Sequence, residues 1–347
     1  MSTIKDVARL AGVGVGTASR ALTGRGSVSD GTAERVRAAA GQLGYRPSSI
    51  AQALSLQRSG AIGVYVPLFD GAFYSEMLGS IDRVLRVQGR HMIAATGCGV
   101  GSPRQKALDG IEFLIGRDCD GLLVASNSLT DDDCTELFRR FPRLVMLNRG
   151  VPGHAKACFS VDHAAAGRLA ARALVAEGHR EIAVIEGPPD APDNRARMRG
   201  FFAELAASGI AVRPEHRREG GFRFSLGAAA ARALVAAGPG GRPDFTALFA
   251  ANDLMAMAAI SALAELGVRV PQDVSVIGYD DSRFSGYTSP PLTTVHVPID
   301  AVAASGCRLL LNACYDSELP VERRFAPTIA WRGSVMRGPH PPLGERP

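Results

Sequence analysis

TIKDVARLAGVGVGTASRAL, residues 3–22, contains two short helical patterns separated by a glycine-rich turn. The apolar side chains of the first pattern recur at the spacing of one helix face, at Ile4, Val7, Ala8 and Ala11. Thr3 and Asp6 fit a capping box, and Gly12 is placed to end this helix. A second pattern, Val15, Ala18 and Leu22, begins after a turn of three residues. The stretch therefore predicts a helix-turn-helix.

Two further helical patterns follow before residue 60. Ser29 or Asp30 can begin a helix whose apolar positions run to Leu43, with Gly44 after it. Residues 48–56 have one apolar side but are too few for an isolated helix to be stable. Helices of this size bury little surface, so we expect the unit to present side chains to a partner rather than enclose a ligand.

The positive charge of the chain is confined to this first segment. Residues 1–60 carry eight Lys or Arg and three Asp or Glu, which accounts for the whole net charge of +5. The other 31 basic and 31 acidic side chains balance. A basic head on a neutral body favours nucleic-acid binding, although the same charge on 60 residues is also compatible with an ordinary solvated surface.

The second helix carries residues suited to the major groove. An Arg such as Arg20 can hold guanine O6 and N7 bidentately, and hydroxyls such as those of Thr17 and Ser19 suit phosphates. A phosphate-cradling loop at Gly12–Gly16 is the rival interpretation. It fails because the glycine spacing is wrong and a helical pattern, not a strand, precedes it.

Composition indicates a globular protein of two or three domains. The chain has 347 residues, 46% hydrophobic and 21% charged, without an apolar run of the ~20 residues that span a bilayer. The first residues do not resemble a secretory signal, so we expect a cytoplasmic protein that does not bind membranes. The six cysteines form no C-x-x-C pair. We therefore expect reduced thiols, no metal site and no cofactor.

From residue 61 onward, strand patterns alternate with helical patterns. The apolar runs predicted as strands are 61–66, 91–95, 121–125, 144–147, 182–185, 247–250 and 274–278. The predicted helices lie near 74–88, 104–116, 162–177, 194–208, 225–237, 253–266 and 300–314. Repeated strand–helix units predict an α/β fold with doubly wound parallel sheets, and the length predicts two lobes. A ligand would bind between the lobes, beyond the carboxyl ends of the strands.

The head resembles the DNA-binding domain of LacI-type (GalR/LacI family) transcriptional regulators. The resemblance rests on residues 3–22, on VSDGTAERV at 28–36, and on LGYRP and SSIAQAL at 43–54. It implies that Val15, Gly16 and Arg20 read bases and that Thr17 and Ser19 hold phosphates. It also implies that 48–56 is a hinge helix, in which Ser48, Ala51 and Leu54 contact DNA and Leu54 wedges into the minor groove.

Two glycines depart from the family pattern. Gly14 stands where the family usually has Ser, which weakens the N-cap of the second helix by a few tenths of a kcal/mol. Gly16 has no side chain with which to read a base. Direct readout would then rest on Arg20 and Val15, with more left to DNA deformability.

The body resembles the sensor of the same family, a two-lobed fold similar to periplasmic sugar-binding proteins. The matching pieces include VMLNR at 145–149, RMRGF at 197–201, FAAND at 249–253 and VSVIGYDD at 274–281. The resemblance implies a ligand pocket that includes Phe73, Tyr74, Asn148, Arg149, Arg197, Phe222, Asn252 and Asp280. Asp, Asn and Arg can pair with vicinal hydroxyls, and aromatic rings can cover the apolar faces of a sugar.

The same resemblance gives domain boundaries. We expect a helix-turn-helix domain at 1–47, a hinge and linker at 48–60, a sensor at 61–333 and a flexible tail at 334–347. Within the sensor, lobe 1 would comprise about 61–160 and 293–325, and lobe 2 about 161–292 and 326–333. The chain would cross between the lobes near 161, 292 and 326.

Several of these positions also have a purely structural interpretation. Asp162, Asn194 and Asp253 stand where helices begin and can be N-caps, which we prefer for Asp253. Arg197 can form a surface ion pair, and Phe73 can belong to the core. We expect Asp281 to be a turn residue, and His296 either to touch ligand or to be structural. The family often has Asn-Pro where this chain has Gly71-Ala72, which leaves the near wall of the pocket open.

These observations predict a sequence-specific repressor. It would bind a near-palindromic double-stranded operator as a homodimer and respond to a small sugar or glycoside in the sensor, in the bacterial cytoplasm at the nucleoid. The alternatives are a solute-binding protein for sugar transport, which the basic head opposes, and an enzyme. For an enzyme we find no G-x-S-x-G, H-E-x-x-H or P-loop motif. Whether ligand releases the protein from DNA or promotes binding stays open.

Overall fold

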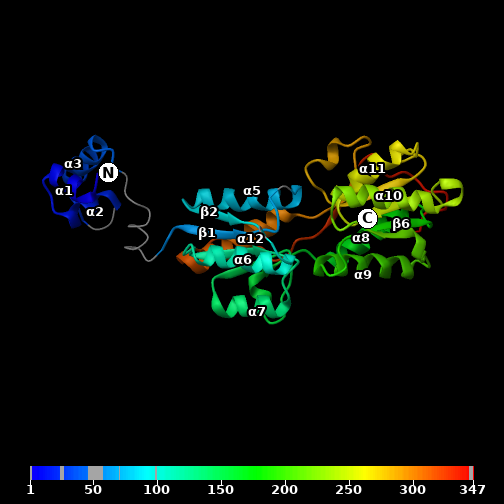
Figure 1. Cartoon of the computed structure of the whole chain (residues 1–347), viewed down its shortest axis with the longest axis horizontal. Helices are drawn as coiled ribbons and strands as arrows, with labels where there is room; N and C mark the ends of the chain where they lie inside the picture. The colour runs from blue at the N-terminus through cyan, green and yellow to red at the C-terminus, as the bar shows by residue number, and fades with distance from the viewer. Residues whose placement is uncertain (1, 24–26, 46–57, 70, 98–99, 344–346) are drawn as a thin grey trace. The chain divides into compact units, whose positions relative to one another are not determined.

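The computed structural model describes residues 2–23, 27–45, 58–69, 71–97, 100–343 and 347. The chain divides into two compact units, Met1–Gly60 and Ala61–Pro347. Figure 1 colours them along the chain, with the first unit in blue.

Short helices make up the described part of the first unit: α1 (Ile4–Ala11), α2 (Val15–Thr23) and α3 (Asp30–Gln42). The capping box at the start of α1 is confirmed, since the Thr3 side chain accepts from the Asp6 amide and the Asp6 side chain accepts from the Thr3 amide. Gly12 ends α1 in the left-handed conformation, at a φ of 65° that favours glycine. The small core contains Val7, Ala18 and Val36. The hinge segment 48–56 lies outside the described residues.

Lobe 1 is built on a parallel sheet of order β2-β1-β3-β4-β5. Its strands are β1 (Ala61–Tyr65), β2 (His91–Ala95), β3 (Gly121–Ala125), β4 (Leu144–Leu147) and β5 (Cys158–Phe159). Its helices are α5 (Ala72–Val87), α6 (Pro103–Ile115), α7 (Asp131–Arg140) and α12 (Ile299–Tyr315). Strand residues on opposite faces of the sheet, such as Ile62 and Tyr65, belong to different core clusters. One cluster packs under α5 and α12, and the other under α6 and α7.

Lobe 2 is built on a sheet of order β11-β10-β9-β8-β6-β7, parallel except for β11, which pairs antiparallel with β10. Its strands are β6 (Ile182–Glu186), β7 (Arg217–Glu219), β8 (Ala247–Ala250), β9 (Ser275–Asp280), β10 (Thr293–His296) and β11 (Thr328–Ala330). Its helices are α8 (His163–Ala176), α9 (Pro192–Ala207), α10 (Phe224–Ala237) and α11 (Asp253–Glu265). Short 3₁₀ turns lie at Ala155–Ala157, Pro214–His216, Pro239–Gly241 and Ser285–Tyr287. The α8–α9 pair and the α10–α11 pair pack into different core clusters.

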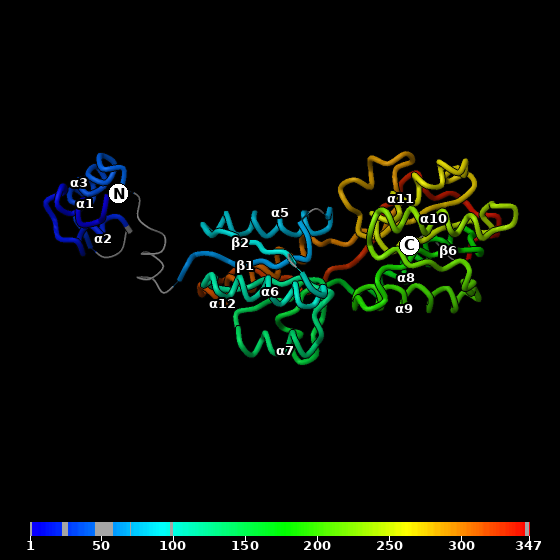
Figure 2. Tube along the Cα trace, in the orientation of Figure 1, coloured from blue at the N-terminus to red at the C-terminus, as the bar shows by residue number. Residues whose placement is uncertain are grey.

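The expected α/β fold with two parallel-sheet lobes is confirmed, but one lobe boundary is wrong. Thr293–His296 pairs in register with Ile277–Asp280 of β9 and therefore belongs to lobe 2. The chain passes between the lobes after β5, between β10 and α12, and before β11, as Figure 2 traces. The second passage thus lies between His296 and Ile299, later than the expected 292. A four-residue strand has too few residues for its pattern to place it in a sheet.

The expectation of a flexible tail is wrong for residues 334–343. Ser334 is buried, and its Oγ donates to the Val276 carbonyl at 2.6 Å. Farther along, the Gly338 amide donates to the Glu177 carbonyl at 2.7 Å, and the Met336 carbonyl lies 3.0 Å from Nε2 of His179. A Pro- and Gly-rich stretch shows no periodicity in sequence, yet its backbone groups are held by hydrogen bonds to lobe 2.

The sequence also missed α7. Its first turn, Asp131–Asp133, is acidic, and its buried side chains are only Cys134, Leu137 and Phe138. None of the helices in the described part of the chain has the length and apolar character needed to cross a membrane.

Candidate functional site

The first candidate surface is the outer face of α2. Val15, Gly16 and Arg20 are exposed, Thr17 and Ser19 are half-buried, and Ala18 and Ala21 face the small core. The Nε of Arg20 donates to the Gly16 carbonyl at 3.3 Å, so the guanidinium lies along the helix surface. The other predicted DNA contacts, Ser48, Ala51 and Leu54, lie outside the described residues.

Neither Gly14 nor Gly16 is required by the packing of the head. A Cβ at either position would meet nothing within 4 Å. The bare backbone at Gly16 is therefore a property of the exposed face of α2 and not of the core beneath it.

The second candidate site is a cavity of about 660 Å³ in the unit Ala61–Pro347. Both lobes line it: Tyr74 from α5 and Asn148 after β4 come from lobe 1, while Arg197 from α9 and Asp280 from β9 come from lobe 2. All the predicted ligand residues except Arg149 line this cavity, namely Phe73, Tyr74, Asn148, Arg197, Phe222, Asn252 and Asp280. The cavity lies where the carboxyl ends of parallel strands were expected to place it.

Arg149 is not part of the cavity wall. Its side chain is buried inside lobe 1, where it donates to the Leu129 carbonyl at 2.8 Å and to Asp131 at 2.5 Å. The backbone turns at Asn148, whose φ of 62° directs the next side chain away from the cavity. Arg149 therefore ties the loop after β3 to the start of α7, and the prediction that it lies in the ligand pocket is wrong.

Arg197 is the buried cation of the cavity. Its residue is 2% exposed, which excludes the surface ion pair considered from sequence. The guanidinium donates to the Ala251 carbonyl, and its Nη2 lies 3.5 Å from Oδ2 of Asp193. The guanidinium also stacks on the ring of Tyr279, with 3.6 Å between Cζ and the ring centroid. A guanidinium that these contacts hold in the cavity wall is suited to donate a hydrogen bond to a ligand oxygen.

Carboxyl groups line the same cavity as this cation. Asp253 accepts from the Ser282 amide at 2.7 Å and from Oγ1 of Thr294 at 2.6 Å, and burial raises its pKa to about 7. Burial also raises the pKa of Asp280 well above its usual range, against the opposing effect of Arg197. Ser282 lies on the same wall, and hydrogen bonds from its amide and its side chain act against the rise in the pKa of Asp253. The wall therefore offers acceptors and donors that a hydroxyl-rich ligand would satisfy.

The expected helix caps are partly correct. Asp162 caps α8 by accepting from the Ala165 amide at 2.8 Å. At α11 the cap is Asn252, which accepts from Met255, so the prediction for Asp253 is wrong. Asn194 is not a cap either, because α9 begins earlier, at Pro192. Its side chain instead holds the loop after β6, accepting from the Gly187 amide at 3.0 Å.

Other expected positions have structural contacts. Phe73 is half-buried and meets Tyr74 edge to face, with 5.3 Å between ring centroids. Asp281 adopts a φ of 57°, as expected of a turn residue, and pairs with Arg332 at 2.6 Å and with His296 at 3.0 Å. His296 does not line the cavity, which favours its structural interpretation.

Sequence reasoning missed Asn127 and Asp193 as cavity residues. Their side chains are joined, since Nδ2 of Asn127 donates to Asp193 at 2.9 Å. Asn127 follows the buried strand β3 just as Asn148 follows β4, and Asp193 precedes Arg197 by one helical turn. The rule that ligands meet the carboxyl ends of strands would have found Asn127.

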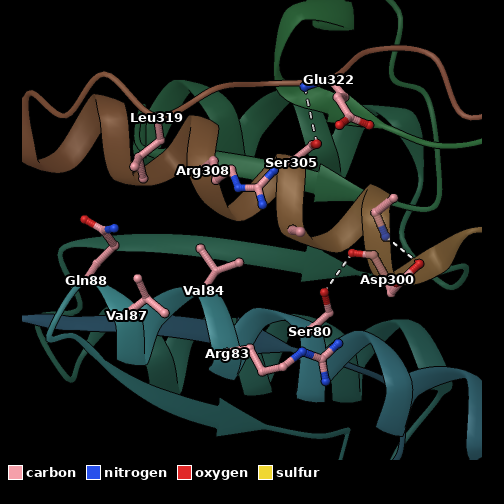
Figure 3. A pocket seen from close by; sticks show the side chains of 12 residues that line it. Ser80, Arg83, Val84, Val87, Gln88, Asp300, Ser305, Arg308, Leu319 and Glu322 are labelled. Carbon is pink, nitrogen blue, oxygen red and sulfur yellow. Dashed lines mark hydrogen bonds between the residues drawn. The ribbon is translucent and has the colours of Figure 1, made fainter.

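A further hollow of about 440 Å³ lies between α5 and α12. Figure 3 shows side chains of both charges around it, with Arg83 on α5 and Arg308 and Asp300 on α12. Oγ of Ser80 donates to the Asp300 carbonyl at 2.7 Å across the two helices.

Comparison with known proteins follows the same division of the chain. Residues 3–48 match the model of bacterial regulatory proteins of the lacI family, and residues 171–335 match a periplasmic binding protein-like domain. The transcriptional regulator GalS of Salmonella typhimurium is 35% identical over 336 residues, which cover 96% of this chain and 97% of that protein.

Solved structures extend the likeness to the whole fold. A LacI-family regulator from Burkhoderia phymatum shares 45% identity, covers 80% of this chain and 100% of its own, and superposes with a TM-score of 0.77. The lac repressor dimer bound to operator and the anti-inducer ONPF shares 26% identity, covers 96% of this chain and 99% of its own, and superposes with a TM-score of 0.85. The chain therefore belongs to the lacI family of bacterial regulatory proteins and is a DNA-binding transcriptional regulator.

Proposed function

We propose that this protein is a repressor that binds a near-palindromic operator as a homodimer and is controlled by a neutral sugar or glycoside in the cavity between its lobes. It would act in the bacterial cytoplasm, where the nucleoid lies. The observation that carries the proposal is the cavity wall itself, where polar side chains of both lobes, among them Asn148, Arg197 and Asp280, line one space. The match of the head to the lacI family and the exposed face of α2 support the DNA-binding part.

The charges of the cavity favour a neutral effector. Its ionisable lining consists of Asp190, Asp193, Asp253 and Asp280 against Lys106, Arg197 and Arg223. Arg197, the buried cation among them, already contacts Asp193 and the Ala251 carbonyl. A phosphate or carboxylate on the ligand would therefore face buried carboxyl groups at close range, which is costly in a low-dielectric site. The apolar rings of Phe73, Tyr74 and Phe222 can cover the carbon-bound faces of a sugar.

The homodimer is proposed from exposed apolar side chains and from the dimeric lac repressor structure. Val87 on α5 is 81% exposed and Tyr287 on lobe 2 is 88% exposed. Side chains of this size are stabilised when a partner covers them. A twofold dimer would present two α2 helices to two half-sites, which is why the operator should be nearly palindromic.

The alternative of a solute-binding protein for transport finds less support. The likeness to GalS and to the lac repressor spans nearly the whole chain, and a family model matches the head itself. A transport protein has no use for a helix-turn-helix head.

The test is a fluorescence-anisotropy titration of the full chain against the DNA that flanks its own gene, at two salt concentrations. We expect tight binding to a near-palindrome and a loss of about 5- to 150-fold in Arg20→Ala, since a bidentate Arg–guanine pair contributes about 1–3 kcal/mol. Arg37→Ala, which removes an exposed charge from α3, is the matched control and should leave discrimination between operator and random DNA unchanged. Only weak binding with a steep salt dependence would contradict a sequence-specific regulator at this site.

The effector is tested by calorimetric titration with neutral sugars and with their phosphorylated counterparts. We expect binding of a neutral sugar that changes operator affinity, and no binding of the phosphorylated form. Tighter binding of the phosphorylated sugar would refute the electrostatic reasoning.

A further inference from the structure

His163 lies at the start of α8, where the chain enters lobe 2 after β5. Its ring is buried, and it does not line the cavity. Nδ1 lies 2.8 Å from Oη of Tyr279 in lobe 2, and Nε2 lies 3.1 Å from Oδ1 of Asn148 in lobe 1. The imidazole therefore connects side chains of the two lobes directly behind the cavity wall.

The hydrogen bonds around His163 define which nitrogen carries the proton. Nδ2 of Asn148 lies 3.5 Å from Asp193, so the amide nitrogen faces the carboxylate and the amide oxygen faces the imidazole. That oxygen can only accept, which places the hydrogen on Nε2. Oγ of Ser160 agrees: it donates to the Val161 carbonyl and is thus free to accept from Nε2, 3.2 Å away. Nδ1 is left as the acceptor for the Tyr279 hydroxyl.

These bonds form one directed chain, which we call the His163 network: Tyr279 to His163, His163 to Asn148, and Asn148 to Asp193. Arg197 links its two ends, because its guanidinium stacks on Tyr279 and pairs with Asp193. Asn148, Asp193 and Arg197 all line the cavity. An effector that binds these residues would therefore act on both ends of a network that joins lobe 1 to lobe 2.

We propose that His163 is a positioning residue of the effector site: as the neutral Nε2–H tautomer it orients the Asn148 amide in the cavity wall and couples the two lobes. This inference rests on the proposed function, since it assigns a role to His163 in effector binding. A neutral imidazole suits the position because it has one donor and one acceptor on opposite sides of a rigid ring.

The surroundings keep this ring neutral. Burial and the positive charge of Arg197 lower the pKa of His163 to about 4, while the carboxylates of Asp193 and Asp162 act in the opposite direction. A protonated ring would direct a second N–H at the Tyr279 hydroxyl, which would then have to turn its own hydrogen away. The network is therefore expected to persist unchanged between pH 8 and pH 5.5.

The first arm of the test uses the sugar-free full chain labelled with ¹⁵N-histidine in solid-state NMR. His163→Asn identifies the His163 signals by difference among the 7 histidines. We expect a bare Nδ1 and a protonated Nε2 from pH 8 to pH 5.5, and in Tyr279→Phe a shift of the Nδ1 signal only. A proton on Nδ1, or a doubly protonated ring at pH 5.5, would overturn the proposal.

The second arm measures binding of D-galactose, D-ribose and cellobiose to three variants. The amide nitrogen of Gln stands near the position of Nε2 and that of Asn near Nδ1, so His163→Gln keeps a donor to Asn148 whereas His163→Asn and His163→Leu do not. We expect affinity within about threefold of wild type for His163→Gln and a loss of about tenfold (about 1.4 kcal/mol) for the other two. His91→Gln, at an exposed position of β2, is the matched control.

The outcomes separate the two claims. Equal sugar affinity in wild type and His163→Leu would overturn the positioning role. If wild type bound none of the sugars, the proposed effector class would fail, and the His163 network would be judged by the tautomer measurement on the sugar-free chain.

Discussion

Replacing Asp280 by Asn should weaken effector binding and at the same time stabilise the sugar-free protein. The carboxyl group of Asp280 lines the cavity, and burial raises its pKa well above the usual range of an Asp. The remaining influences are Arg197, which lowers the pKa, and Asp253, Asp193 and Glu76, which raise it. Ionisation of this group in the folded protein therefore has a free-energy cost that it does not have in the unfolded chain.

The direction of the pH effect follows from proton linkage. A carboxyl group whose pKa is higher in the folded state binds more protons there, so the free energy of unfolding falls as pH rises above the ordinary value of 3.8. Each unit of pKa elevation corresponds to about 1.4 kcal/mol. Asn has the same shape and no charge. We therefore expect Asp280→Asn to be more stable than wild type by about 1 kcal/mol or more at pH 8, with a smaller gain at pH 5.

Effector affinity should change in the opposite direction. A hydrogen bond to a charged group contributes about 1.5–3 kcal/mol, so loss of the Asp280 carboxylate should weaken sugar binding by about 10- to 150-fold. Urea unfolding at pH 5 and pH 8 and calorimetric titration measure the two effects, with Asp132→Asn on the exposed face of α7 as control. A variant less stable than wild type at pH 8, with sugar affinity intact, would refute the reasoning.

Three other changes test the head, the core and the dimer. Gly14→Ser should stabilise the head by a few tenths of a kcal/mol in thermal unfolding, because it supplies an N-cap for α2 where a Cβ meets nothing within 4 Å. Phe201→Ala should lower the free energy of unfolding by about 3–5 kcal/mol in urea titration, because Phe201 is fully buried and stacks on Phe249 at 4.3 Å; a loss under 1 kcal/mol would contradict this packing. Tyr287→Ser should shift the dimer toward monomer in analytical ultracentrifugation, and an unchanged dissociation constant would exclude lobe 2 at this point from the interface.

Local patterns were sufficient for most elements of the fold. The strands β3, β4 and β8 have the residue bounds that their apolar runs predicted, because strands buried on both faces are continuous apolar segments. Short or half-exposed elements were missed for the opposite reason: β5 has two residues, and the pattern of α7 is obscured by its acidic first turn. A pattern of so few residues has no measurable period.

Resemblance identified the cavity residues that lie within matched motifs but not the orientation of each side chain. Asn148 and Arg149 are adjacent in the same motif, yet only Asn148 lines the cavity. Asn252 lines the cavity and also caps α11, whereas Asp253, the expected cap, instead holds Ser282 and Thr294. Such differences depend on one backbone dihedral or on a shift of the helix start by one residue. Sequence patterns place the start of a helix only to within a few residues.

By itself, the sequence determined that a basic helix-turn-helix head precedes a two-lobed α/β body, because capping residues, glycine stops and apolar periodicity are local properties of the chain. Only the tertiary structure decided which polar groups meet behind the cavity wall. His163 and Tyr279 are 116 residues apart, and Asn148 and Asp193 are 45 residues apart. Their contacts arise because the carboxyl ends of the strands of both sheets lie around one cavity, and no local pattern of residues encodes which side chains then face one another.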